Sequence, residues 1–121
     1  METKNMTNDE LKKALKLHAL WVEFPGWGKK LELSGRSLGA CDFSGADLSF
    51  ADLSNADLRD ANFSNAFLYN TNLTGARLNR AYMQGASMFE AKFTTELDGA
   101  FNVGSPDQQY SWTQEWFSKS K

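Results

Sequence analysis

Residues 41–95 consist of five-residue units that read CDFSG ADLSF ADLSN ADLRD ANFSN AFLYN TNLTG ARLNR AYMQG ASMFE AKFTT. In each of the eleven units a small residue is followed two places later by Leu, Phe or Met. The small residue is Cys41 in the first unit, Thr71 in the seventh and Ala in the others. The large residues are Phe43, Leu48, Leu53, Leu58, Phe63, Leu68, Leu73, Leu78, Met83, Met88 and Phe93. A strict period of five therefore governs almost half of the chain.

This period matches neither the 3.6-residue repeat of an amphipathic helix nor the two-residue repeat of a half-buried strand. If the chain turns a corner in every unit, four units close a coil of twenty residues, and the small and the large residues both point inward. The positions between them are typical of turns, since Ser, Asn, Gly or Thr often follows the large residue and Asp or Asn often precedes it. Units that bury their core only by stacking predict a solenoid.

The units at 46–60, Ala-Asp-Leu-Ser-Phe, Ala-Asp-Leu-Ser-Asn and Ala-Asp-Leu-Arg-Asp, resemble the pentapeptide-repeat family. The resemblance covers 55 of 121 residues, or 65 when the degenerate units around Leu31 and Arg36 are included. It implies an all-β fold, a right-handed quadrilateral β-helix of about three coils. Because a long cation cannot replace an inward Ala in a closed core, we expect the regular helix to begin near Cys41 and the unit of Arg36 to be distorted.

Residues 1–30 are expected to form an N-terminal cap on the β-helix of residues 31–95. A helix is predicted over 7–24, where Thr7 and Glu10 form a capping box and Pro25-Gly26 follows. Its apolar face contains Leu11, Ala14, Leu15, His18, Trp21 and Val22. The apolar side is widened further by Leu17, Leu20 and Phe24. We therefore expect the helix to be covered by the open end of the solenoid.

Residues 96–121 are expected to form a C-terminal turn and a second capping helix. The period breaks after Thr95, Asp98-Gly99 indicates a turn, and Ser105-Pro106-Asp107 is typical of a helix start. The segment that follows carries four aromatic residues within eight positions, namely Tyr110, Trp112, Trp116 and Phe117. Terminal units of solenoids generally need covers, so these rings are expected to be buried.

Composition favours a small soluble protein of the cytoplasm. The net charge is −2, the chain has one Cys, and its start lacks the layout of a signal peptide. No basic patch suggests direct binding to nucleic acid, and no apolar run approaches the roughly 18 residues of a membrane span.

The residues that carry chemistry are few, and no enzyme, cofactor or metal site is expected. His18 is the single histidine and Cys41 the single cysteine, so the two cannot build a zinc site. His18 lies on the buried face of the predicted helix, and Cys41 occupies an inward small-residue position. We expect both residues to have packing roles.

A candidate interaction surface appears when the sequence is wrapped at twenty residues per coil. The segments 46–50, 66–70 and 86–90 then stack, and their outward aromatic residues are Phe50, Phe67, Tyr69 and Phe89. Clustered aromatic residues on one face indicate a covered or binding surface. We expect them to meet either the Tyr110–Phe117 segment or a second copy of the chain, which favours a protein-protein interaction module and allows a homodimer.

An acidic belt offers an alternative function. It consists of Asp42, Asp47, Asp52, Asp57 and Asp60, opposed within residues 41–60 only by Arg59. Some members of the resembled family act on DNA gyrase and are thought to mimic duplex DNA, which implies a possible DNA-mimicking regulator. Residues 41–60 carry −4, whereas residues 61–80 carry +2 from Arg77 and Arg80, so the acidic charge is confined to one end of the repeats.

Overall fold

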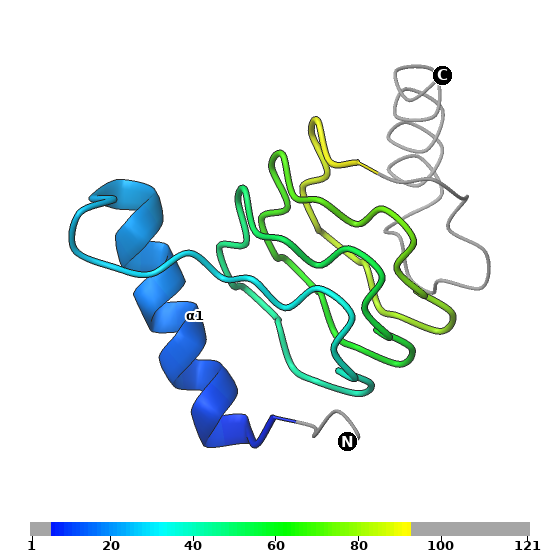
Figure 1. The fold of residues 1–121 in the computed structure, drawn as a ribbon. Coiled ribbons are helices and arrows are strands. Elements are labelled where there is room, and N and C mark those ends of the chain that lie inside the picture. Colours follow the sequence, from blue (N-terminus) through cyan, green and yellow to red (C-terminus); the bar gives the residue numbers. More distant parts are fainter. Residues whose placement is uncertain (1–5, 93–121) are drawn as a thin grey trace.

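The computed structural model describes residues 6–92, which form helix α1 followed by a solenoid (Figure 1). Helix α1 spans Asn8–Glu23 and is capped by Thr7. The Thr7 hydroxyl accepts the backbone N–H of Glu10 at 3.0 Å, and the Glu10 carboxylate accepts the backbone N–H of Thr7 at 2.9 Å. The predicted helix and its capping box are therefore confirmed.

The solenoid is held together by parallel bridges that join residues twenty positions apart. Nine such bridges lie among the described residues, from Glu32↔Asp52 to Asn72↔Lys92. In a typical pair, the Leu58 N–H donates to the carbonyl of Arg77, and the Arg77 N–H donates to the carbonyl of Ala56, both at 2.9 Å. Each side contributes a single bridge residue because the chain turns again within five residues. The twenty-residue register predicted from the period is confirmed, and so is the β-helix that the family resemblance implies.

Every fifth residue from Gly35 to Glu90 has a positive φ, which turns the chain at each corner. These residues are Gly35, Ala40, Gly45, Phe50, Asn55, Asp60, Asn65, Asn70, Gly75, Arg80, Gly85 and Glu90. Gly, Asn and Asp adopt this left-handed conformation most readily, which explains their frequency here. Phe50, with φ 67°, is the bulkiest apolar residue at a described corner.

The inward small and large residues form one continuous core. Among the large residues, Phe43, Leu48, Leu53, Leu58, Phe63 and Leu68 have no exposed surface. The rings of Phe43 and Phe63 stack in parallel across two coils, with centroids 4.9 Å apart. Thr71 takes the place of an inward Ala and is fully buried. Its hydroxyl can be buried because it donates a hydrogen bond to the carbonyl of Leu48 at 2.7 Å.

The regular solenoid begins at Leu31, so the prediction that it begins near Cys41 after a distorted unit is wrong. Ser37 forms a bridge with Asp57, and the Leu38 N–H donates to the Asp57 carbonyl at 2.8 Å. Arg36 occupies an inward position, but no coil lies on its outer side. Its half-buried side chain instead lines a pocket beside α1.

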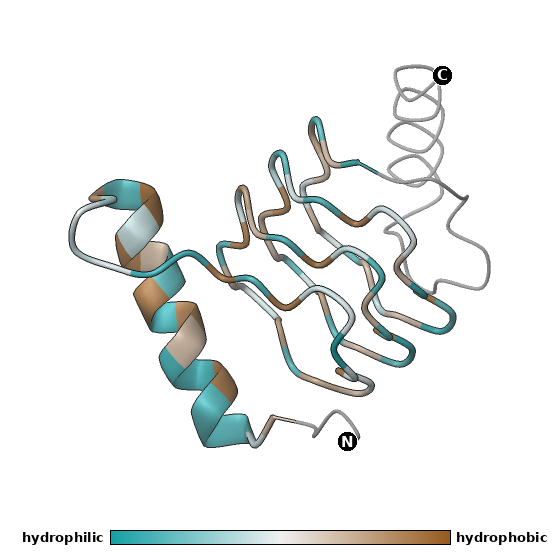
Figure 2. Ribbon diagram, in the orientation of Figure 1, coloured by the Kyte–Doolittle hydropathy of each residue, from teal (hydrophilic) through white to brown (hydrophobic). Residues whose placement is uncertain are grey.

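Helix α1 lies across the open end of the first coil (Figures 1 and 2). Leu11 and His18 are buried, and Ala14 and Leu15 pack against the core. The expectation that the whole apolar side is covered is wrong, because a helix crossing a coil buries only one stripe of its surface. Three apolar residues of the widened side remain exposed: Leu17, Leu20 and Phe24.

The predicted C-terminal turn and capping helix at 96–121, with Tyr110, Trp112, Trp116 and Phe117, lie outside the described residues, as does the end of the repeats after Lys92. Helix α1 is the one helix between residues 6 and 92, and it lacks the length and apolarity needed to cross a bilayer.

Candidate interaction surface

One side of the solenoid carries a ladder of exposed aromatic rings, which we call the aromatic face. It consists of Phe50, Phe67, Tyr69 and Phe89, each 41–53% exposed. Tyr69 stacks on Phe89 with ring centroids 5.4 Å apart and planes 10° apart. Phe50 meets Tyr69 edge to face, at 5.8 Å and 86°. The face thus presents a preassembled aromatic surface rather than scattered single rings.

The register of the coils creates this ladder. Tyr69 and Phe89 occupy the same position in consecutive coils, so coil stacking places them about one strand spacing apart, roughly 4.8 Å. Phe67 occupies a bridge position, paired with Asp47 on one side and Ser87 on the other. Its side chain therefore points outward, where most units of the repeat have a polar residue.

Phe50 adopts a left-handed backbone conformation that is unfavourable for a large side chain. A residue with a side chain pays roughly 1–2 kcal/mol to adopt the left-handed conformation, and a bulky residue there is uncommon. The corners at Gly45 and Asn55, on either side of Phe50, carry residues suited to that conformation.

The acidic belt is built largely from turn-forming carboxylates. One carboxylate oxygen of Asp42, Asp47 and Asp52 accepts the backbone N–H two residues later, at 2.9, 3.0 and 3.0 Å. The Ser44 and Ser54 hydroxyls also donate to Asp42 and Asp52, each at 2.6 Å. These hydroxyls, helped by the backbone N–H groups, lower the pKa of both carboxyls. The aspartates thus stabilise the corners whatever else they do.

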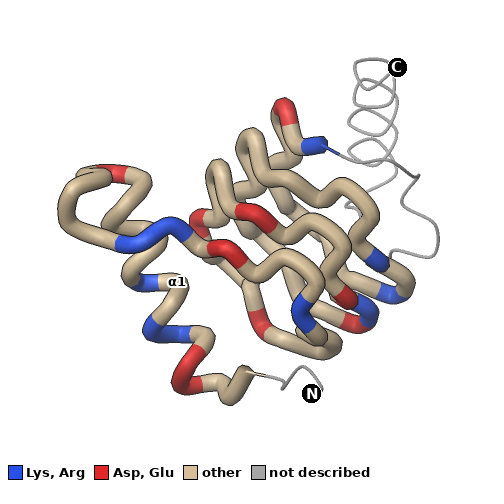
Figure 3. The backbone as a smooth tube through the Cα atoms, viewed as in Figure 1, with Lys and Arg blue, Asp and Glu red and all other residues tan. Residues whose placement is uncertain are grey.

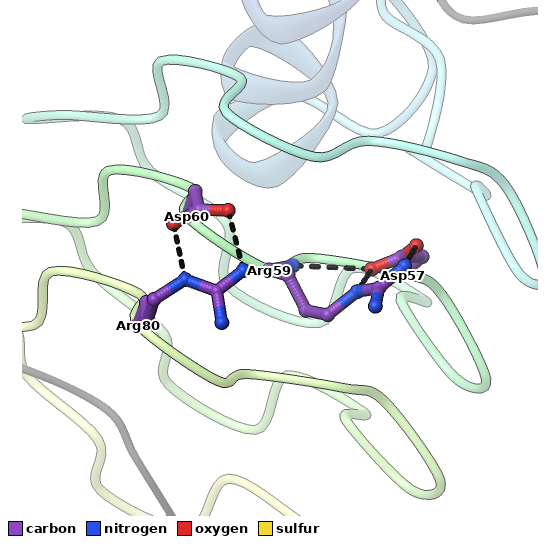
Figure 4. Close-up of polar contacts among 4 residues, drawn as sticks. All are labelled: Asp57, Arg59, Asp60 and Arg80. Atoms are coloured by element: carbon purple, nitrogen blue, oxygen red, sulfur yellow. Dashed lines mark hydrogen bonds and ion pairs between the residues drawn. The ribbon is translucent and has the colours of Figure 1, made fainter.

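Two members of the belt are neutralised by arginines (Figure 4). Asp57 accepts from Nε and Nη2 of Arg59 at 2.8 and 2.7 Å. Asp60 accepts from Nε and Nη2 of Arg80, one coil further on, at 2.8 and 3.0 Å. These hydrogen bonds lower the pKa of both carboxyls. Both contacts are ion pairs, and they reduce the net charge of the belt.

His18 joins helix α1 to the first coil through both of its ring nitrogens. Nδ1 accepts the backbone N–H of Leu31 at 2.9 Å, so Nε2 carries the proton and donates to the Ser49 carbonyl at 2.8 Å. Burial lowers the pKa of the imidazole. The predicted packing role is confirmed, but the sequence contains no signal for these hydrogen-bond partners.

Cys41 is buried at its inward position, as predicted, and burial raises the pKa of its thiol. Between residues 6 and 92, no group of three or more His, Cys, Asp or Glu side chains is arranged to hold a metal ion.

The repeats identify the family. The family model for pentapeptide repeats, with eight copies, matches residues 41–80 and 56–94. These are the units that build the solenoid, so the repeats of this chain belong to the pentapeptide-repeat family and form a pentapeptide-repeat β-helix. Comparison with curated proteins gives no significant match.

Two similar solved structures are cyanobacterial pentapeptide-repeat proteins. Rfr23 of Cyanothece 51142 is 27% identical with a TM-score of 0.36, and the match covers 59% of this chain and 43% of Rfr23. HetL of Nostoc sp. strain PCC 7120, which is involved in the regulation of heterocyst differentiation, is 29% identical with a TM-score of 0.38. That match covers 57% of this chain and 41% of HetL. The chain therefore matches less than half the length of either protein.

Proposed function

We propose that the protein is a non-catalytic scaffold that binds a protein partner, or a second copy of itself, through the aromatic face. The observation that carries this proposal is the stacked ladder of Phe50, Tyr69 and Phe89, which is exposed to solvent. Aromatic residues are enriched in protein interfaces, where they supply a large contact area at a low entropic cost.

The strained corner at Phe50 supports the same proposal. Gly or Asn would form this corner more easily, so a Phe with φ 67° indicates that the ring itself is useful. The ring serves no purpose in the core, since it is 45% exposed. Within the chain the ring contacts Tyr69 edge to face, and a contact with another molecule would give its exposed part a further role.

Photocrosslinking tests this proposal with a matched control. Tyr69 and Tyr82 are both 41% exposed, but Tyr82 lies outside the aromatic face. Each is replaced in turn by p-benzoylphenylalanine, and the protein is irradiated alone and in an extract of its source organism. We expect crosslinks to a second copy or to a distinct protein from position 69 and few from position 82.

Other crosslinking results would contradict the proposal. Crosslinks from position 69 to residues 105–121 of the same chain would show that the C-terminal segment covers the aromatic face. Equal yields from positions 69 and 82, or no intermolecular product at position 69, would show that the face does not select a partner.

The alternative function is a DNA-mimicking regulator of a nucleic-acid enzyme such as gyrase. Asp42, Asp47 and Asp52 support it, because none of them forms an ion pair within residues 6–92. The pairing of Asp57 and Asp60 with arginines weakens it. A gyrase supercoiling assay distinguishes the two functions, since mimicry predicts inhibition that fades as salt is raised, whereas the proposed scaffold leaves the enzyme unaffected.

A further inference from the structure

A pocket of about 340 Å³ lies between helix α1 and the first coil. Its apolar wall includes Leu17 from the helix and Leu31 and Leu33 from the coil. Three cations also line it, namely Lys29, Lys30 and Arg36. Figure 3 shows the basic connection leading from α1 into the first coil. The pocket therefore combines an apolar wall with a concentration of positive charge.

Arg36 is the residue that the repeat pattern does not explain. The equivalent positions in the next two coils are Ala56 and Ala76, both buried. Arg36 is half-buried and takes part in neither of the two ion pairs described above for residues 6–92. Its guanidinium is therefore not committed to an acidic side chain in either of these ion pairs. A bound anion could accept its N–H groups.

The charges around the pocket favour an anionic ligand. Glu32 is the one acidic residue of the lining, against the three cations. The Nζ of Lys30 lies 5.8 Å from the ring centroid of Trp21, so this cation is held beside the helix. The planar guanidinium of Arg36 can offer two parallel N–H donors, which match the two oxygens of a carboxylate.

We propose that this pocket binds a small amphipathic carboxylate, such as the anion of a medium-chain fatty acid. The carboxylate lies at Arg36, and the apolar chain lies along Leu17, Leu31 and Leu33. The volume falls at the small end of the roughly 300–1,000 Å³ typical of ligand sites, which suits a short chain. Because the walls come from both α1 and the coil, the ligand binds only when the helix is docked and therefore stabilises the docked state.

Calorimetric titration with sodium octanoate tests the proposal, with octanol and sodium acetate as probes that lack the charge or the chain. We expect saturable binding of octanoate and at least tenfold weaker binding of the other two. Arg36→Ala should weaken octanoate binding at least tenfold, whereas Arg77→Ala, which removes an exposed cation outside the pocket lining, should not change it. Circular dichroism confirms that each variant is folded.

A second variant covers the case in which Arg36→Ala does not fold. Leu17→Glu places a negative charge on the apolar wall at an exposed position of α1, and it should abolish octanoate binding while the protein stays folded. The proposal is overturned if octanoate shows no saturable binding, if octanol binds equally well, or if the folded variants bind octanoate like the wild type.

Discussion

His18 of helix α1 donates a hydrogen bond from Nε2 to the carbonyl of Ser49, the residue that precedes Phe50 of the aromatic face. The Nδ1 of the same ring accepts the N–H of Leu31, so the docked helix requires a neutral imidazole. Protonation of Nδ1 would place two hydrogens against each other and break the second hydrogen bond. The attachment of α1 to the first coil is therefore sensitive to acid.

We predict that the protein loses stability as the pH falls from neutral to about 5. Burial lowers the pKa of His18 in the folded state below its ordinary value of about 6.5. Below that value the unfolded chain binds a proton that the folded chain resists, so the free energy of unfolding decreases as the pH falls. Urea denaturation at pH 7.5, 6.5 and 5.5 measures the effect.

His18 is the single histidine, so a His18→Gln variant isolates its contribution. This variant should be less stable at pH 7.5, and its stability should change much less between pH 7.5 and 5.5. A pH dependence as steep as that of the wild type would show that His18 does not cause the effect.

We predict that Asp52→Ala destabilises the protein and that Asp52→Asn largely preserves its stability. The carboxylate accepts the backbone N–H and the hydroxyl of Ser54, and an amide oxygen can accept the same hydrogen bonds. Loss of a hydrogen bond of this kind costs about 0.5–1.5 kcal/mol. Chemical denaturation compares the two variants, and equal losses would show that the negative charge, not the turn geometry, matters.

The lowered pKa of Asp52 also predicts that the effect of Asp52→Ala on stability depends on pH. A carboxyl with a depressed folded pKa stabilises the protein above its unfolded pKa of about 3.9 and loses that contribution as the pH falls further. The difference in stability between the wild type and Asp52→Ala should therefore shrink in strongly acidic solution. A constant difference across that range would contradict the assigned hydrogen bonds.

We predict that Gly75→Ala is more destabilising than Gly35→Ala. Both glycines have a positive φ, 74° and 73°, so each substitution incurs the left-handed cost of roughly 1–2 kcal/mol. A Cβ at Gly75 would also collide with the side chain of Asn55 in the coil below, whereas nothing lies within 4 Å of a Cβ at Gly35. Thermal and chemical denaturation rank the two variants.

A double variant identifies the source of that difference. In Asn55→Ala/Gly75→Ala the colliding amide is removed, so the additional cost of Gly75→Ala should largely disappear. If Gly75→Ala and Gly35→Ala were equally destabilising, the Asn55 side chain would move aside at little cost, and the predicted difference would be wrong.

We predict that Phe50→Gly leaves the protein at least as stable as the wild type. Glycine relieves the left-handed strain of roughly 1–2 kcal/mol, which offsets the loss of the edge-to-face contact with Tyr69, worth about 0.5–1.5 kcal/mol. Chemical denaturation measures the balance. A loss of more than about 2 kcal/mol would mean that Phe50 has a structural role and would remove the argument that its ring is kept for binding.

Much of the architecture could be predicted from the spacing of small and large residues. The period of five defines the twenty-residue register, and that register by itself places Tyr69 beside Phe89. The same register also places Asp60 next to Arg80, but this ion pair emerges only when the charges are compared between coils rather than summed within one. The capping box at Thr7 predicts the start of α1 because it is a local signal.

Other features depend on where an element lies, which a repeat pattern does not encode. Arg36 is tolerated because the first coil is open on one side, so the rule that excludes a cation from an inward position does not apply there. Leu17 and Leu20 remain exposed because α1 crosses the coil and contacts it along a single stripe. The hydrogen-bond partners of His18 are backbone groups, so the types of the side chains in the sequence cannot predict them.

Sedimentation velocity of the fluorescently labelled protein in an extract of its source organism tests the central claim most directly. The account predicts that the wild type sediments in a complex larger than one chain and that Phe67→Lys/Phe89→Lys sediments as a single chain. The control Tyr82→Lys/Gln84→Lys, which changes two exposed residues on another side of the solenoid, should behave like the wild type. If the wild type and Phe67→Lys/Phe89→Lys sedimented alike, with both proteins folded, the aromatic face would not be a binding surface.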